Sequence, residues 1–238
     1  MHKHVSKHNE MKSKIFKYLV VVIFLITACD SLSKENFDVA ADIASVVHAD
    51  TYKLVFQKVL KGTNPEKKYY VELTIINSKL IDEGADPKLV ASYCAYELHK
   101  RLDKKTIERN YGYELKMSEK SEHTYFFKKS EVKLASYGIK TMNKYFNFVL
   151  ENNLKKAESI LNLEEESDSV TNITSEIRTR IEKSKEKPNH FFGEYTNEIE
   201  NDCWFVMSYI NIDEENYITT KALIKKSNPE EIIYLEID

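Results

Sequence analysis

Four short runs with the character of β-strands close the chain, and they constrain its fold more than any other feature. They are rich in β-branched and aromatic residues, which suit the pleated, half-buried surface of a sheet. The connections between them, near residues 200–202, 213–216 and 227–230, are too short to hold a crossover helix. Short connections of this kind indicate an antiparallel sheet of consecutive strands. The predicted strands are residues 191–198, 203–212, 217–225 and 232–237.

Helical periodicity precedes these strands. Apolar residues recur every three or four positions from residue 130 to the Asn152-Asn153 pair, and a shorter repeat follows at 154–161. A third helix is predicted to carry Ile173, Ile177 and Ile181 and to end before Pro188. We therefore expect helices packed on the closing sheet.

The first half of the chain predicts a strand, a helix and two further strands. Residues 70–77 alternate as a strand does, Asp86-Pro87 supplies an N-cap and a first-turn proline for a helix over 86–102, and strands follow at 111–117 and 124–128. If 70–77 and 111–117 are parallel neighbours, the helix crosses over and covers one sheet face. Before this unit, residues 37–61 predict an amphipathic helix, although 52–60 also fit a strand.

Helices followed by a consecutive sheet are typical of the α+β class. We expect an N-terminal α/β part over residues 37–130 and a C-terminal α+β part over 131–238, as one domain or two. In element order and size, the chain from residue 141 onward resembles the small NTF2-like (cystatin-like) domains of many bacterial lipoproteins. That resemblance implies a curved four-stranded antiparallel sheet around a long helix, with room for a pocket.

The N-terminus has the features of a cleaved export signal. Lys12, Lys14 and Lys17 precede the apolar stretch 18–28, which is shorter than the roughly 20 residues that a membrane-spanning helix needs. The start of the chain, Met1 or Met11, is left open, as are an ordinary secretory signal and an uncleaved anchor.

The sequence Ile26-Thr27-Ala28-Cys29 at the end of that stretch resembles the lipobox of bacterial lipoproteins. The resemblance implies cleavage between Ala28 and Cys29 and acylation of Cys29. Residues 1–28 would then be a signal peptide, and 29–36 a lipidated tether. The resemblance also implies a place in a bacterial cell envelope, where the protein is anchored by lipid and faces the periplasm or the surface. The choice of inner or outer membrane stays open.

Charge excludes one class of partner. The chain has 35 basic and 38 acidic residues, and loss of residues 1–28 would leave 30 and 37, a net charge near −7. Nucleic-acid binding needs a basic surface that neutralises phosphates, so we expect no nucleic-acid partner.

The remaining cysteines, Cys94 and Cys203, are expected to be buried thiols. Cys94 lies on the same predicted helical stripe as Ala91, Ala95 and Leu98, where a free cysteine behaves as a small apolar residue. A disulfide between the two cysteines is the alternative in an exported chain.

Sequence motifs for catalysis, metal binding or a cofactor are not found. The five glycines form no phosphate-binding loop, and Glu97 and His99 lack the spacing of a zinc protease. Most aromatic residues are expected in the core, while Trp204 and Tyr195, which have polar neighbours in the sequence, are expected to be partly exposed and to contact a ligand or partner.

These features favour a membrane-anchored, non-catalytic envelope lipoprotein. Its expected partners are membrane lipid, through acylated Cys29, and an envelope protein, cell-wall fragment or small apolar ligand. Two other hypotheses are an inhibitory or immunity-type lipoprotein directed against an exported toxin or hydrolase, and an enzyme whose site assembles only in the fold.

Overall fold

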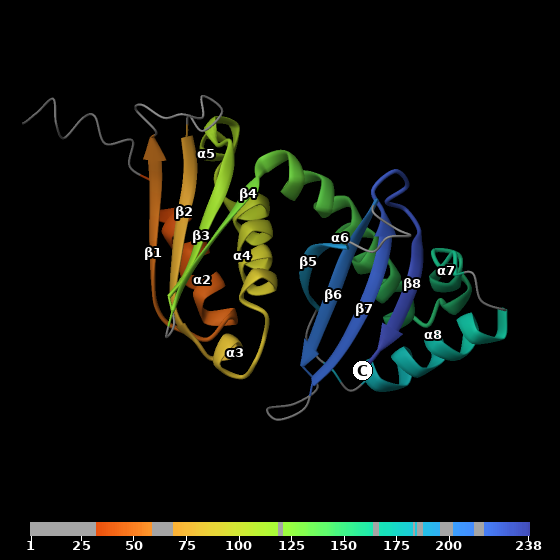
Figure 1. Cartoon of the computed structure of the whole chain (residues 1–238). Helices are drawn as coiled ribbons and strands as arrows, with labels where there is room; N and C mark the ends of the chain where they lie inside the picture. Colours follow the sequence, from red (N-terminus) through yellow and green to blue (C-terminus); the bar gives the residue numbers. More distant parts are fainter. Residues whose placement is uncertain are drawn as a thin grey trace, which may run out of the picture. The chain divides into compact units, whose positions relative to one another are not determined.

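In the computed structural model, the strands of the described residues form two four-stranded sheets (Figure 1). The described residues are 32–58, 69–118, 121–163, 167–182, 184, 188–195, 202–211 and 217–238. Lys34–Asp238 is one compact unit. The chain therefore belongs to the mixed α+β class, as the sequence predicted.

The first sheet, sheet A, contains strands of both directions. Its order is β1-β2-β3-β4, with β2 and β3 parallel and the two outer pairs antiparallel. Residues 70–77 and 111–117 are parallel neighbours, which is the condition stated above for a crossover helix, with Leu73 opposite Leu115. The strands are β1 (Ala49–Lys58), β2 (Tyr69–Ser78), β3 (Gly112–Ser118) and β4 (Glu122–Lys128).

The predicted helix over residues 37–61 is wrong in its second half, where the alternative strand forms. Helix α2 spans Lys34–Val46 and β1 begins at Ala49. Between them His48 adopts a positive φ of 50°, a conformation that ends a helix. After this break, Leu54 pairs with Leu73 and is buried, so the packing of alternate side chains on β2 outweighs the helical pattern.

Helix α4 (Pro87–Arg101) is buried around its whole circumference. Every residue from Val90 to Leu98 is buried, because α4 contacts α2, β3 and β4 as well as β5 of the second sheet. Its N-cap is as predicted: the Asp86 side chain accepts a hydrogen bond of 2.8 Å from the backbone N–H of Lys88. The two halves of the chain therefore share this helix as a common core.

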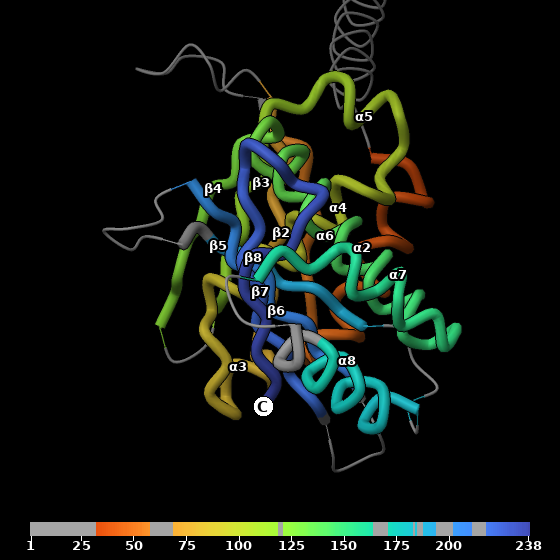
Figure 2. The backbone as a smooth tube through the Cα atoms, turned by 90° about the vertical axis from the view of Figure 1, so that its right-hand side faces the viewer, coloured from red at the N-terminus to blue at the C-terminus, as the bar shows by residue number. Residues whose placement is uncertain are grey.

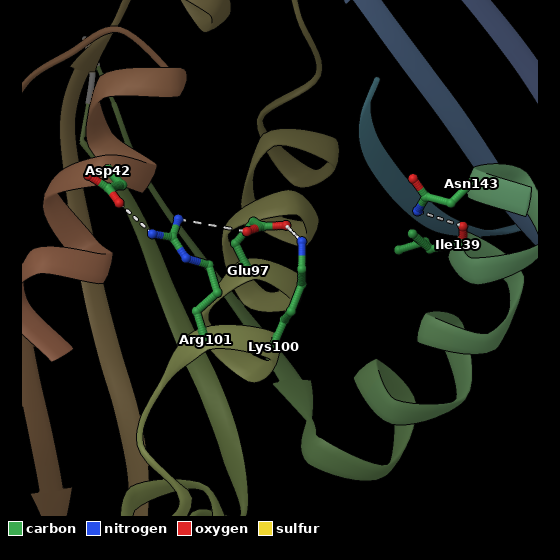
Figure 3. Close-up of polar contacts among 6 residues, drawn as sticks. All are labelled: Asp42, Glu97, Lys100, Arg101, Ile139 and Asn143. Atoms are coloured by element: carbon green, nitrogen blue, oxygen red, sulfur yellow. Dashed lines mark hydrogen bonds and ion pairs between the residues drawn. The ribbon is translucent and has the colours of Figure 1, made fainter. Parts of the chain in front are cut away.

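A polar network joins α4 to α2 (Figure 3). Arg101 forms an ion pair with Asp42 of α2, and its other terminal nitrogen lies 3.9 Å from the Glu97 carboxylate. Lys100 approaches the same carboxylate at 3.1 Å. The nearly buried Glu97 is thus compensated by two cations, as a charge in this position requires.

Sheet B has the order β5-β6-β7-β8, and each neighbouring pair is antiparallel. Helix α6 packs on it: a Cβ added at Gly138 would lie 3.4 Å from the Ile224 side chain. Helix α8 packs on α6, where the Tyr145 hydroxyl bonds to Thr174 at 3.2 Å. Figure 2 shows α8 beside α7. The elements are α6 (Lys129–Leu150), α7 (Leu154–Glu158), α8 (Ser167–Ile181), β5 (Asn189–Tyr195), β6 (Cys203–Asn211), β7 (Tyr217–Lys225) and β8 (Ile232–Ile237).

Two short helices mark opposite ends of sheet A. Helix α3 (Lys79–Asp82) follows the last residue of β2, whereas α5 (Lys104–Arg109) lies at the strand's start, where the backbone N–H of Tyr111 bonds to the Tyr69 carbonyl at 2.8 Å. Figure 1 shows α5 at the upper end of the sheet and α3 at the lower end.

Both cysteines of the described residues, Cys94 and Cys203, are buried free thiols, as the sequence predicted. Burial raises the pKa of the Cys94 thiol, which keeps it protonated.

We expect Leu98→Asp to unfold the unit. Leu98 is completely buried on α4, and an unpaired carboxylate there costs ~4 kcal/mol or more, a large part of the ~5–15 kcal/mol that stabilises a typical domain. Thermal unfolding measures the effect. Leu134→Asp is the matched control, because Leu134 is exposed on α6. An unchanged melting temperature for Leu98→Asp would contradict the role assigned to α4.

Candidate ligand-binding pocket

A cavity of about 150 Å³ lies where the edge strand β4 of sheet A approaches the edge strand β5 of sheet B. The starts of helices α4 and α6 contribute its charged residues. The cavity is large enough for a group the size of one aromatic ring. It is lined by Lys88, Phe126, Phe127, Glu131, Phe192, Gly193 and Trp204.

Two successive residues of β4, Phe126 and Phe127, line the cavity. Successive side chains of a strand point to opposite faces, so Phe126 and Phe127 lie on different sides of sheet A. Phe127 is buried toward the core, while Phe126 is half-buried and packs against Tyr70 and Tyr111 on the other side. Both residues belong to the lining, so the cavity lies at the edge of this strand.

Three aromatic rings connect the two sheets along this cavity. The ring centroids of Phe127 and Phe192 lie 5.8 Å apart at 66°, and those of Phe192 and Trp204 lie 5.8 Å apart at 87°. Edge-to-face pairs of this kind add to the stabilisation that burial alone gives. The walls are therefore held in fixed positions by rings that also belong to the core.

The expectation that Trp204 is partly exposed is wrong, since only 3% of the residue is exposed. Trp204 alternates with Val206 and Ser208 on the core face of β6, so its polar sequence neighbours do not surround it in space. The Lys226 ammonium lies 4.7 Å from its ring centroid, within cation–π range.

The indole N–H of Trp204 is buried and has no hydrogen-bond partner within the described part of the chain. A buried donor left unpaired costs about 1–3 kcal/mol, so such a group is uncommon in a stable interior. Trp204 also lines the cavity, although its indole nitrogen has almost no accessible surface there.

Charged groups lie beside the aromatic walls. Lys88 is exposed in the first turn of α4, and Glu131 is half-buried in the first turn of α6. The Glu131 carboxylate accepts a hydrogen bond of 2.9 Å from the backbone N–H of Lys128. An occupant of this pocket would therefore meet apolar rings and groups of both charges at once.

The other predicted site residues lie outside what the structure describes. Tyr195 belongs to β5 and pairs with Cys203, but its side chain is not among the described ones, so its contact with a ligand stays a prediction. Ala28 and Cys29 fall in residues 1–31, which precede the described part.

A buried polar row crosses sheet B beside these aromatics. His190 Nδ1 lies 2.9 Å from Ser208 Oγ, and Ser208 pairs with Thr220 on the next strand. All three side chains are buried, and His190 Nε2 and Thr220 Oγ1 have no partner in the described region. Burial, with a smaller contribution from the Lys100 cation, lowers the pKa of His190 to about 3. A histidine and a serine sealed in this way form a neutral structural pair.

Metal ligands do not gather in the described ranges: no group of three or more His, Cys, Asp or Glu side chains could hold an ion there. The same ranges contain no helix that is both long and apolar enough to cross a bilayer.

Comparison of the chain with protein-family models, with curated proteins and with solved structures gives no match. The pocket is therefore interpreted from its own chemistry.

The buried histidine makes the stability of the protein fall in mild acid. Its folded pKa of about 3 lies below the ordinary value of 6.5, so the unfolded chain binds one proton more between these two values. The free energy of unfolding should decrease by about 1.5 kcal/mol from pH 6.5 to pH 5 because of this group.

Denaturant unfolding at several pH values measures this slope. His190→Asn should remove that share of the pH dependence, whereas the control His123→Asn, at an exposed site on β4, should retain it. Equal slopes in the two variants would show that His190 is not the responsible group.

Proposed function

We propose that this protein is a bacterial envelope lipoprotein that is anchored through acylated Cys29 and binds a small, largely apolar ligand in the pocket between β4 and β5. One observation supports the binding role above all others: a cavity of about 150 Å³ whose lining combines Phe126, Phe127, Phe192 and Trp204 with only two charged residues. Pockets of this composition, with few polar groups among apolar walls, are typical of ligand sites.

The anchor is supported by the order of residues at the N-terminus. A lysine-rich start, an apolar stretch of eleven residues and Ile26-Thr27-Ala28-Cys29 follow one another as in lipoprotein precursors. Two or more acyl chains hold a protein stably on a bilayer, at about 0.8 kcal/mol per buried methylene. A ligand-binding body held in this way would act beside a lipid surface.

The size and chemistry of the cavity suggest the class of ligand. About 150 Å³ accommodates one ring or a short branched alkyl group, and Lys88 and Glu131 suit an occupant that carries both a hydrogen-bond acceptor and a donor. A ring-sized apolar group that carries an amide meets both conditions. The occupant could be a small molecule or one side chain of a larger envelope component.

The cavity favours this role over the inhibitory alternative, which would be supported by an exposed acidic or aromatic patch without a hollow. The finer assignment of the C-terminal half to the NTF2-like group belongs to the same proposal. Its support is the order β5-β6-β7-β8 with the long helix α6 packed on the sheet.

Loss of the acylated cysteine should release the protein from the membrane or leave its precursor unprocessed. We expect Cys29→Ala to accumulate as an unprocessed or soluble form, because no thiol remains to be acylated. Incorporation of labelled palmitate and membrane fractionation measure the effect. Palmitate in Cys29→Ala at the wild-type level would contradict the assignment of the anchor.

Filling the cavity should abolish ligand binding without unfolding the protein. A Cβ at Gly193 would meet only the Leu89 side chain within 4 Å, at an ordinary 3.5 Å, so a side chain can begin there without a clash. We expect Gly193→Leu to occupy the cavity and Gly193→Ala to leave it open. Trp204 is the only tryptophan of the chain, so its fluorescence reports on the pocket directly.

Benzamide, which combines one ring with a carbonyl acceptor, is a suitable probe. Its titration should change Trp204 emission saturably in the wild type and in Gly193→Ala, with binding weakened at least about tenfold in Gly193→Leu, equivalent to ~1.4 kcal/mol. The same response in all three proteins would refute a site in this cavity.

A further inference from the structure

We propose that the end of the protein formed by the starts of α2, α5 and α6 lies against an anionic lipid surface. We call this the basic end and define it by Lys34, Phe37, Lys104, Lys105, Lys128 and Lys129. The proposal rests on the lipid anchor of the proposed function and adds an orientation of the body at the membrane.

Side-chain contacts bring the three helix starts together. In α2, the Asn36 amide donates to Thr106 Oγ1 of α5 at 3.2 Å, and its oxygen accepts from the Asp103 backbone N–H at 3.0 Å. In α6, Lys129 Nζ donates to the Ile107 carbonyl of α5 at 3.1 Å. The first turns of α2 and α6 therefore both meet α5.

The short tether limits the distance between this end and the anchor. Five residue steps separate Cys29 from Lys34, and even a fully extended chain spans no more than about 3.6 Å per step. The start of α2 can then be no farther than about 18 Å from the acylated residue. Any partner of the basic end would have to fit within that distance of the bilayer.

The charge of this end is opposite to that of the whole chain. The chain carries a net charge of −3, whereas the exposed charges of this end sum to +1: Lys34, Lys104, Lys105 and Lys128 are exposed, as are Glu35, Asp38 and Glu108. Lys104 lies 3.7 Å from the Glu108 carboxylate. Lys104 is 89% exposed, and Lys105 and Lys128 are exposed as well. The α2 and α6 dipoles add partial positive charge at their first turns, where Glu35 and Glu131 offset part of it.

An exposed aromatic residue completes the surface. Phe37, in the first turn of α2, is 42% exposed although it is a large apolar side chain. Lysines with an aromatic residue between them suit the headgroup region of an anionic bilayer, where the ring enters the interface and each lysine gains about 1 kcal/mol, or roughly fivefold, from the surface potential. Charge complementarity and the short tether thus both favour lipid as the occupant.

Covalent lysine labelling tests the proposal on the full lipidated protein. The protein is placed in detergent, in phosphatidylcholine vesicles, and in vesicles that also contain phosphatidylglycerol, and an amine-acylating reagent is followed at each lysine by mass spectrometry. We expect labelling of Lys104, Lys105 and Lys128 to slow about fivefold only in the anionic vesicles. Lys79, on α3 at the opposite end of sheet A, and Lys155, on α7 beside sheet B, are exposed internal controls that should label at one rate throughout.

Paired charge reversals sharpen the test. Lys104→Glu with Lys105→Glu should remove the protection of Lys128, whereas the matched control Lys79→Glu with Lys155→Glu should retain it. Equal labelling in detergent and anionic vesicles, or equal protection in neutral vesicles, would overturn the proposal. Protection in native membranes without protection in pure lipid would identify a protein as the occupant and would also overturn it. Palmitate incorporation, measured on the same samples, separates a failure of the anchor from a failure of this surface.

Discussion

Burial of α4 on all sides is the constraint on which the rest of the structure depends. One side of the helix packs against α2 and sheet A, and another packs against β5 of sheet B, so neither sheet has a complete core without it. Small side chains such as Ala91, Cys94 and Ala95 let the neighbouring elements approach closely. The same helix accounts for the pocket: it contacts both β4 and β5, which share no ladder, and residues of both strands line the cavity.

The pocket and the basic end are linked through α6. The first turn of this helix supplies Glu131 to the cavity and Lys129 to the contacts with α5. A ligand that enters beside Glu131 would therefore bind close to the end of the body that we assign to the lipid surface. This arrangement suits a protein that exchanges a membrane-soluble or membrane-attached group with its pocket, since such a group would have a short path to the cavity.

Local signals in the sequence predicted the elements well, whereas spatial neighbours were not predictable. Asp86-Pro87 placed the start of α4 correctly, because a cap and a first-turn proline act within a few residues. Residues 52–60 were ambiguous, because only the pairing of Leu54 with β2 decides between helix and strand. Trp204 was assigned to the surface from its sequence neighbours, although its environment comes from Phe192 and Lys226. The pocket residues Phe126, Phe127 and Phe192 had no signal that distinguished them from core aromatics.

The two buried cysteines have a consequence for how such a chain would mature. An oxidising compartment offers disulfide exchange to every accessible thiol, and in the native state Cys94 and Cys203 are both enclosed, Cys94 with its thiolate disfavoured as well. The interval between emergence of the chain and closure of its core is then the period in which wrong bridges can form. Rapid packing of α4 would shorten this period because it encloses the thiols. Slowly folding variants would accumulate cross-linked species even when their native state is stable.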